Sequence, residues 1–227
     1  MVERTPLRVV LADDERMVRA GIASILASAT GFEVVGEASD GAEAVALVAQ
    51  HGPDIALLDV QMPGTDGLSA ADTILAQHPG TAVVVLTTFS EDAYVARALG
   101  GGASGFVLKT GDPNDLVSGL RAVADGGAYL SPEIARRVID ELGAGGTRGR
   151  MSRGALARER VGQLTERERE VLGLLGEGLS NDAIARRLGI VPGTAKVHVG
   201  SILSRLGVAN RVQAAILAYE AGLIAET

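Results

Sequence analysis

The first half of the chain alternates short apolar runs with longer segments in which apolar residues recur every three or four positions. Short runs rich in β-branched residues are typical of buried strands, and the longer spacing is typical of amphipathic helices, as at Arg16–Ala27 and Asp66–Ala76. Five strand-then-helix repeats predict an α/β fold: a doubly wound five-stranded parallel sheet with helices on both faces. The predicted strands are Leu7–Ala12, Glu33–Ala38, Asp54–Asp59, Ala82–Thr88 and Ser104–Leu108.

Beyond residue 130 the strand pattern stops. Ser131-Pro132 predicts the start of another helix, which ends near Leu142. The stretch Gly143–Arg160 is rich in glycine and arginine and has little apolar periodicity, so we predict a flexible linker there. Four short helical patterns from Thr165 onward predict a small all-α domain. The predicted domains are residues 1–128, a helix and flexible linker at 129–161, and residues 162–227.

Helix boundary signals in this last domain place two short helices on either side of a tight glycine turn. Thr165 and Glu168 form a capping-box pair for the preceding helix, and Ser180 is a suitable N-cap for the next. That helix stops at Gly189, and another begins at Pro192. Such a pair is typical of a helix-turn-helix, which either binds DNA or serves as a plain packing element.

Composition and charge narrow the class of protein. Of the 227 residues, 47% are apolar, which allows a sizeable core, and the lack of cysteine excludes disulfides and thiolate metal sites. The N-terminal residues show no signal-peptide pattern and no apolar stretch approaches about 18 residues, so we expect a cytoplasmic protein without a membrane segment. The net charge of −7 is uneven, because residues 1–130 carry −10; the overall acidity therefore does not argue against nucleic-acid binding.

Acidic residues follow two strands that are neighbours in a sheet of flavodoxin-like order, 2-1-3-4-5. Asp13 and Asp14 end the first apolar run, and Asp59 ends the third. Because the carboxyl ends of parallel strands meet at one edge, we expect the three carboxylates to converge there, where a hard cation such as Mg²⁺ would neutralise them. Thr87 ends the fourth run, and Lys109 follows the fifth.

These five side chains together suit phosphoryl transfer. Mg²⁺ and Lys109 would neutralise charge on the transferred group, Thr87 would donate a hydrogen bond to it, and Asp59 would be the nucleophile. The plainer alternative is that these acids are solvated loop residues. A phosphatase of the haloacid-dehalogenase type is a third interpretation, but such enzymes have a second acid where this chain has Gln61.

The segments VLADDERMVRAGI, IALLDVQMPGTDGL, VVVLTTF and GASGFVLK resemble the receiver domain of two-component response regulators, over residues 7 to about 126. The resemblance implies that Asp59 is the phosphoacceptor. It also implies that Asp13 and Asp14 hold Mg²⁺, with the backbone carbonyl of Gln61 as a further ligand.

The same resemblance assigns a conformational switch. It implies that Thr87 and Phe106 change position on phosphorylation, while Thr110 replaces the proline that usually follows the lysine. Gln61 and Phe89 should flank the route of the hydrolytic water, and neither is an acid that could orient that water. We therefore predict a persistent phosphoryl group; the alternative is that both side chains only pack.

The second helix of the helix-turn-helix pair has a buried face and an outward face. On the outward face, Lys196 could donate to guanine acceptors and Val197 could touch a thymine methyl group. The positions predicted to contact phosphates are Thr194, Ser201 and Arg205. The positions spaced to face the core are Ala195, Val199, Ile202 and Leu206.

The segment LTEREREVLGLLGEGLSNDAIARRLGI, with TAKVHVGSILSRLGVANRVQA after it, resembles the LuxR-type DNA-binding domain of the NarL/FixJ family of response regulators. This resemblance covers about residues 162–224. Gly200 stands at an outward position that is often basic in relatives. We therefore predict modest DNA affinity from one domain, made adequate by a homodimer on two half-sites.

Together these patterns predict a DNA-binding transcriptional response regulator and not an enzyme. A sensor histidine kinase would phosphorylate Asp59 in the presence of Mg²⁺, and the C-terminal domain would then bind promoter DNA. Two further alternatives stay open: a phosphorylation-independent regulator whose acidic pocket is a relic, and a signalling adaptor that binds only proteins.

Overall fold

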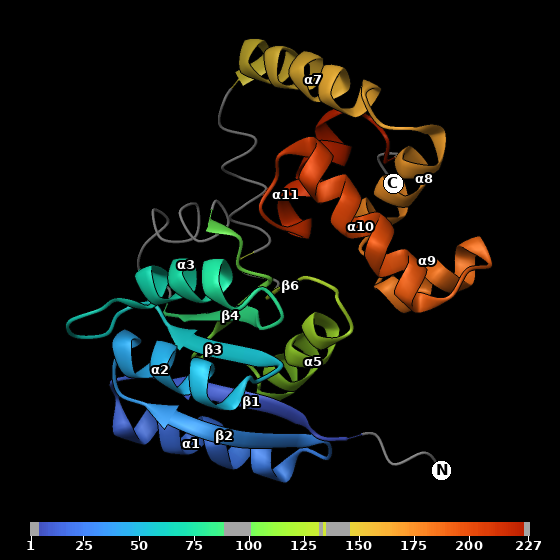
Figure 1. Cartoon of the computed structure of the whole chain (residues 1–227). Helices are drawn as coiled ribbons and strands as arrows, with labels where there is room; N and C mark the ends of the chain where they lie inside the picture. Colours follow the sequence, from blue (N-terminus) through green and yellow to red (C-terminus); the bar gives the residue numbers. More distant parts are fainter. Residues whose placement is uncertain (1–4, 89–100, 132–133, 135–145, 225–227) are drawn as a thin grey trace. The chain divides into compact units, whose positions relative to one another are not determined.

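The computed structural model describes residues 5–88, 101–131, 134 and 146–224 (Figure 1). The chain divides into two compact units, the first built around a parallel sheet and the second from helices. In the part of the chain that the structure describes, no helix is both long enough and apolar enough to span a membrane.

The first unit is a parallel sheet with the strand order β2-β1-β3-β4-β5-β6, which contains the predicted order 2-1-3-4-5. The predicted strand ends are confirmed to within one residue. The sheet also has a sixth edge strand of two residues, which is too short to leave a recognisable alternation in the sequence. The strands are β1 (Leu7–Ala12), β2 (Phe32–Ala38), β3 (Ile55–Asp59), β4 (Ala82–Thr87), β5 (Gly105–Leu108) and β6 (Tyr129–Leu130).

Helices cover both faces of the sheet (Figure 1). On one face, Leu26 and Leu120 bury the apolar sides of α1 and α5 against the strands, while α2 and α3 pack together on the other face. Because both faces are covered, β3 is an unbroken apolar run, fully buried from Ile55 to Leu58, that ends at Asp59. These helices are α1 (Arg16–Ser28), α2 (Gly41–His51), α3 (Gly67–Gln77) and α5 (Pro113–Ala124).

The second unit is a helical bundle around one apolar core. The predicted caps are confirmed: Thr165 and Glu168 form a reciprocal capping box, and the Ser180 side chain accepts from the backbone N–H of Ala183. Gly189 ends the following helix in the left-handed conformation, with φ of 66°. The helices are α7 (Gly146–Gly162), α8 (Glu166–Gly176), α9 (Asn181–Leu188), α10 (Pro192–Leu206) and α11 (Arg211–Glu220).

Helix α7 occupies most of the stretch predicted to be a flexible linker, Gly143–Arg160. That prediction is wrong from Gly146 onward. Glycine lowers helix propensity, but Ala157 and Val161 are buried in the core of the second unit, and this tertiary packing outweighs the local preference. The helix predicted to start at Ser131 lies almost entirely outside the described residues.

Candidate functional site

Asp59 is the last residue of β3 and lies at the carboxyl edge of the sheet, 3% exposed. The chain then turns into α3, and the backbone N–H of Gly67 donates to the carbonyl of Val60 at 3.0 Å. Gly67 passes so close that a Cβ atom there would lie 1.7 Å from the carbonyl oxygen of Asp59. The turn that holds Asp59 therefore requires glycine at residue 67, which sequence reasoning missed.

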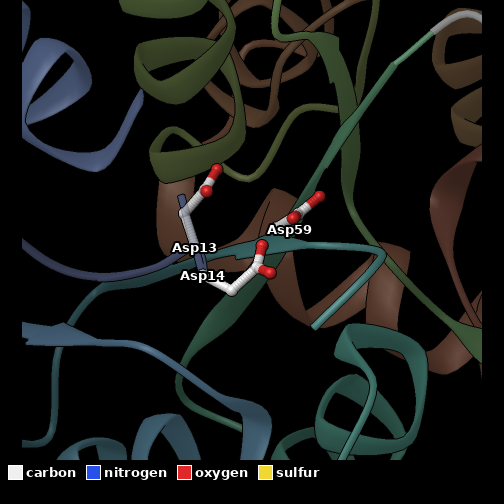
Figure 2. A group of neighbouring side chains, drawn as sticks. All are labelled: Asp13, Asp14 and Asp59. Carbon is white, nitrogen blue, oxygen red and sulfur yellow. The ribbon is translucent and has the colours of Figure 1, made fainter. Parts of the chain in front are cut away.

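Asp13 and Asp14 follow β1 and meet Asp59 at the same edge of the sheet (Figure 2). One carboxylate oxygen from each residue lies within 4.8 Å of the others. Asp13 is fully buried and accepts a hydrogen bond from the backbone N–H of Glu15 at 2.9 Å, whereas Asp14 is exposed. Three converging carboxylates form an oxygen-only donor set that is compatible with a metal ion.

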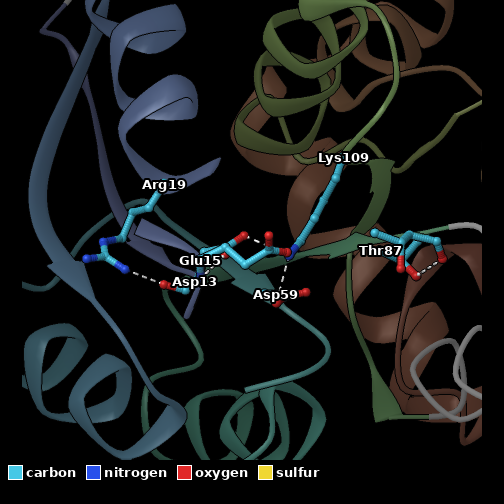
Figure 3. Close-up of polar contacts among 7 residues, drawn as sticks. Asp13, Glu15, Arg19, Asp59, Thr87 and Lys109 are labelled. Carbon is cyan, nitrogen blue, oxygen red and sulfur yellow. Dashed lines mark hydrogen bonds and ion pairs between the residues drawn. The ribbon is translucent and has the colours of Figure 1, made fainter. Parts of the chain in front are cut away.

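Lys109, directly after β5, lies between the two buried carboxylates (Figure 3). Its Nζ atom is 2.8 Å from Asp59 Oδ2 and 2.9 Å from Asp13 Oδ2. The exposed side chain of Glu15 is farther away, at 3.8 Å. Because the Lys109 side chain is only 6% exposed, its charge directly offsets the repulsion between Asp13 and Asp59.

Burial and charge shift the protonation of both Asp59 and Lys109. Burial raises the pKa of Asp59; the hydrogen bond and charge of Lys109 only partly offset this, and Asp13 adds to the rise. Burial alone lowers the pKa of Lys109, but its close pairing with the carboxylates of Asp59 and Asp13 outweighs that effect and leaves the pKa raised. Lys109 therefore stays a cation at neutral pH and can pair with an anion at this edge.

Thr87 and Phe106 lie outside this ion-pair network. The Thr87 hydroxyl donates to the carbonyl of Thr88 at 2.9 Å (Figure 3). Phe106 pairs in register with Val85 of the neighbouring strand, and its side chain is 1% exposed. The structure thus gathers the charged residues of the predicted site and leaves the predicted switch pair apart from them.

The residues around the predicted water route are only partly described. Gln61 is exposed, and its backbone amide acts to lower the pKa of Asp59. Phe89 lies outside the described residues, so the predicted persistence of the phosphoryl group stays a prediction.

Arg19 supports the pocket from α1, and sequence reasoning missed it. Its guanidinium donates to the backbone carbonyl of Asp13 (Figure 3). It also pairs with Glu37 at 3.4 Å. In the sequence, its role is signalled by a basic residue in the first turn of the helix that follows Asp13 and Asp14.

Helix α10 has the two faces predicted from its spacing. The four core positions are buried, while Thr194, Lys196 and Arg205 are exposed and Ser201 is half-buried. Val197 is 71% exposed, so its apolar side chain is free to contact a partner of the helix. The outward face thus presents cationic, hydroxyl and apolar groups together, the mixture that reads base edges in a major groove.

Glu168 joins α10 to the start of α8. It accepts from the backbone N–H of Thr165 at 2.9 Å, from the Ser201 hydroxyl at 3.3 Å and from the Arg205 guanidinium at 3.3 Å. The hydrogen bonds from Thr165, and then the charge of Arg205, lower the pKa of Glu168. Two positions predicted to contact phosphates are therefore also bound within the domain.

Known proteins match both units of the chain. Residues 9–121 match the response regulator receiver domain, and residues 162–218 match the LuxR family of bacterial regulatory proteins. The uncharacterized transcriptional regulatory protein YxjL of Bacillus subtilis is 36% identical over 98% of this chain and all of its own length. This chain belongs to the NarL/FixJ family of two-component response regulators.

Other relatives resemble this response regulator along nearly its whole length. LiaR of Bacillus subtilis is 37% identical, over 96% of this chain and 99% of LiaR. The crystal structure of ChrA, from a heme-sensing two-component system, is 35% identical and matches 97% of this chain and all of ChrA, with a TM-score of 0.53. The structure of two RcsB dimers bound to two parallel DNAs is 25% identical and matches 96% of this chain and all of that one, with a TM-score of 0.56. The family consists of DNA-binding regulators of transcription and not of enzymes, as predicted.

Proposed function

We propose that this response regulator is switched by Mg²⁺-dependent phosphorylation of Asp59, and that a sensor histidine kinase supplies the phosphoryl group. The observation that carries the proposal is a buried aspartate 2.8 Å from a buried lysine, beside two further carboxylates. Membership of a two-component family supports the kinase as the partner.

The residues at the pocket fit Mg²⁺. Asp13, Asp14 and Asp59 offer carboxylate oxygens, and the backbone carbonyl of Gln61 is the further ligand we propose. Asp13 Oδ2 is buried and lacks a hydrogen bond of ordinary geometry, although Lys109 Nζ is near it. When bound, Mg²⁺ supplies positive charge that offsets the charge of the phosphoryl group.

In the transfer step, a carboxylate oxygen of Asp59 attacks the phosphorus of the kinase phosphohistidine. The new P–O bond forms as the P–N bond breaks, and the imidazole leaves with the electron pair and takes up a proton. Lys109 exchanges its bond to Asp59 for one to a phosphoryl oxygen. Thr87 turns from the carbonyl of Thr88 to donate to another phosphoryl oxygen, and Phe106 moves into the space that Thr87 leaves.

The test of phosphorylation is intact mass spectrometry of the full chain after incubation with Mg²⁺ and acetyl phosphate. We expect the mass of one phosphoryl group to be added to the wild type and to Asp72→Asn, which changes an exposed acid on α3. Asp59→Asn should gain nothing. Phosphate incorporation that persists in Asp59→Asn would show that another residue is the acceptor.

We further propose that α10 binds promoter DNA and that the chain acts there as a homodimer. The exposed Lys196 and Val197 support DNA contact, and the DNA-bound dimers of the relative RcsB support the assembly. Fluorescence anisotropy with duplex DNA at several salt concentrations measures this, because phosphate contacts make affinity fall steeply with salt. If acetyl phosphate and Mg²⁺ leave the affinity unchanged, the chain is instead a phosphorylation-independent regulator.

A further inference from the structure

Helix α7 precedes the residues that match the LuxR family, yet its second half packs into the same core. Ala157 and Val161 are 2% and 4% exposed. Gly154 lies so close to α11 that a Cβ atom there would be 3.2 Å from the carbonyl oxygen of Glu220. Small residues on one helix face allow such a close approach, so this half of α7 belongs structurally to the C-terminal unit.

Arg160 connects α7 to the end of α10. The backbone N–H groups around Gly207 bond the carbonyls of Leu203 and Ser204, whereas the carbonyl of Leu206 accepts a hydrogen bond from the Arg160 guanidinium. The last carbonyls of a helix have no partner inside the helix, and a cation placed there also interacts favourably with the helix dipole. Arg160 therefore supplies both a hydrogen-bond donor and a positive charge at the end of α10.

We infer that Arg160 is a positioning residue for DNA binding, which fixes the C-terminal end of α10 from α7. This inference rests on the proposed role of α10 at DNA. The helix is then held from two sides, because Glu168 binds Ser201 and Arg205 from the start of α8. Without Arg160 the C-terminal end of α10 loses one of these two attachments.

The loss of Arg160 should affect the position of the outward residues of α10. Lys196 and Val197 lie in the first half of the helix, about two to three turns from Leu206. A small tilt about the Glu168 attachment displaces these side chains relative to a groove, and base contacts tolerate displacement less than phosphate contacts do. Loss of Arg160 should therefore reduce specific binding more than nonspecific binding.

The experiment compares full-length, acetyl-phosphate-treated variants on two duplexes of about two helical turns. One duplex is selected from random sequence by the wild type, and the other is a scramble of the same composition. The variants are Arg160→Ala, Arg160→Lys and Arg158→Ala; the last removes an exposed arginine of the same helix and controls for lost charge. Affinity is measured by anisotropy at several salt concentrations, with the thermal unfolding midpoint recorded for each variant.

We expect Arg160→Ala to bind the selected duplex about three- to tenfold more weakly, with little change on the scramble and an unchanged salt slope. Arg160→Lys should recover part of the loss, and Arg158→Ala should match the wild type. A salt slope reduced by about one phosphate would overturn the inference in favour of a direct DNA contact. Equal losses in Arg158→Ala, or no loss at all, would also overturn it.

Two controls keep the result interpretable. If Arg160→Ala unfolds, Arg160→Met, which keeps the apolar stem but has no donor for the Leu206 carbonyl, is judged against Arg158→Met by the same criteria. If the wild type selects no duplex and binds DNA without salt dependence, the proposed DNA-binding function itself is wrong, and that outcome is separate from any effect of Arg160.

Discussion

Lys109 and Glu168 are each a single ionised group that satisfies several partners. Lys109 lies between the buried carboxylates of Asp13 and Asp59, and Glu168 binds both the N-cap of α8 and the outward side of α10. Removal of either group leaves more than one neighbour without its partner, so its effects should exceed those of an ordinary surface ion pair.

Replacing Lys109 tests the charge balance of the pocket. Lys109→Met keeps the length of the side chain but removes the cation that competes with a metal ion for Asp13 and Asp59. We expect tighter Mg²⁺ binding by isothermal titration calorimetry, together with slower phosphorylation of Asp59, because the lysine no longer pairs with the phosphoryl group. Lys196→Met in the other unit is the matched control. Unchanged Mg²⁺ affinity in Lys109→Met would mean that the lysine does not compete with the ion for Asp13 and Asp59.

Glu168 gives a pH dependence whose sign follows from its lowered pKa. A carboxylate whose pKa is lower in the folded state stabilises the fold above its unfolded pKa of about 4.3, and this contribution is lost as the pH falls through the folded value. We expect Glu168→Gln to be less stable than the wild type at neutral pH and the difference to shrink at acidic pH. Urea unfolding at a series of pH values measures it; a constant difference would contradict the ionic role.

At the scale of elements, the turn between β3 and α3 sets the position of Asp59, the proposed phosphoacceptor. Gly67→Ala would place a methyl group against the carbonyl of Asp59, and we expect a loss of about 1–3 kcal/mol or more in the free energy of unfolding. Phosphorylation should slow as well, because Asp59 must shift. Gly80→Ala is the control, since a Cβ atom there has no neighbour within 4 Å. Equal stabilities of the two variants would contradict this account.

Gly200, inside α10, and Gly207, directly after its last residue, have opposite expected responses to replacement by alanine. Gly200 lies mid-helix with open space around it, so Gly200→Ala should stabilise the second unit by about 0.5–1 kcal/mol. Gly207 ends the helix with φ of 60°, so Gly207→Ala should destabilise it. Chemical denaturation of the two variants measures both effects. If both variants changed stability in the same direction, backbone conformation would not be what determines the effect of alanine at these positions.

At the scale of the whole molecule, the proposed function requires that a phosphoryl group on Asp59 changes how the chain associates. If the proposed homodimer forms on phosphorylation, acetyl phosphate and Mg²⁺ should raise the sedimentation coefficient of the wild type in analytical ultracentrifugation and leave Asp59→Asn unchanged. The DNA affinity should then depend on protein concentration. A phosphorylated wild type that sediments as a monomer at all concentrations would contradict the dimer.

Sequence reasoning succeeded where the signal is local or periodic. Strand ends, the strand order and the capping residues followed from alternation, helix spacing and cap chemistry, and the acids fell at the pocket because parallel strands share one carboxyl edge. It failed at α7, whose glycines and arginines indicate a linker while Ala157 and Val161 are buried in a core that only the folded bundle creates. It also missed Gly67, because the close approach to Asp59 is a contact between backbone segments.

The sequence by itself determined the class of fold, the family and the residues that could carry phosphoryl transfer, since each depends on residue types at fixed spacings. Only the tertiary structure decided which side chains are paired. Lys109 binds both Asp13 and Asp59, while Glu168 and Arg160 hold α10 from separate helices. The reason is physical: these partners are far apart in the chain, and burial sets both their distance and the strength of their charges.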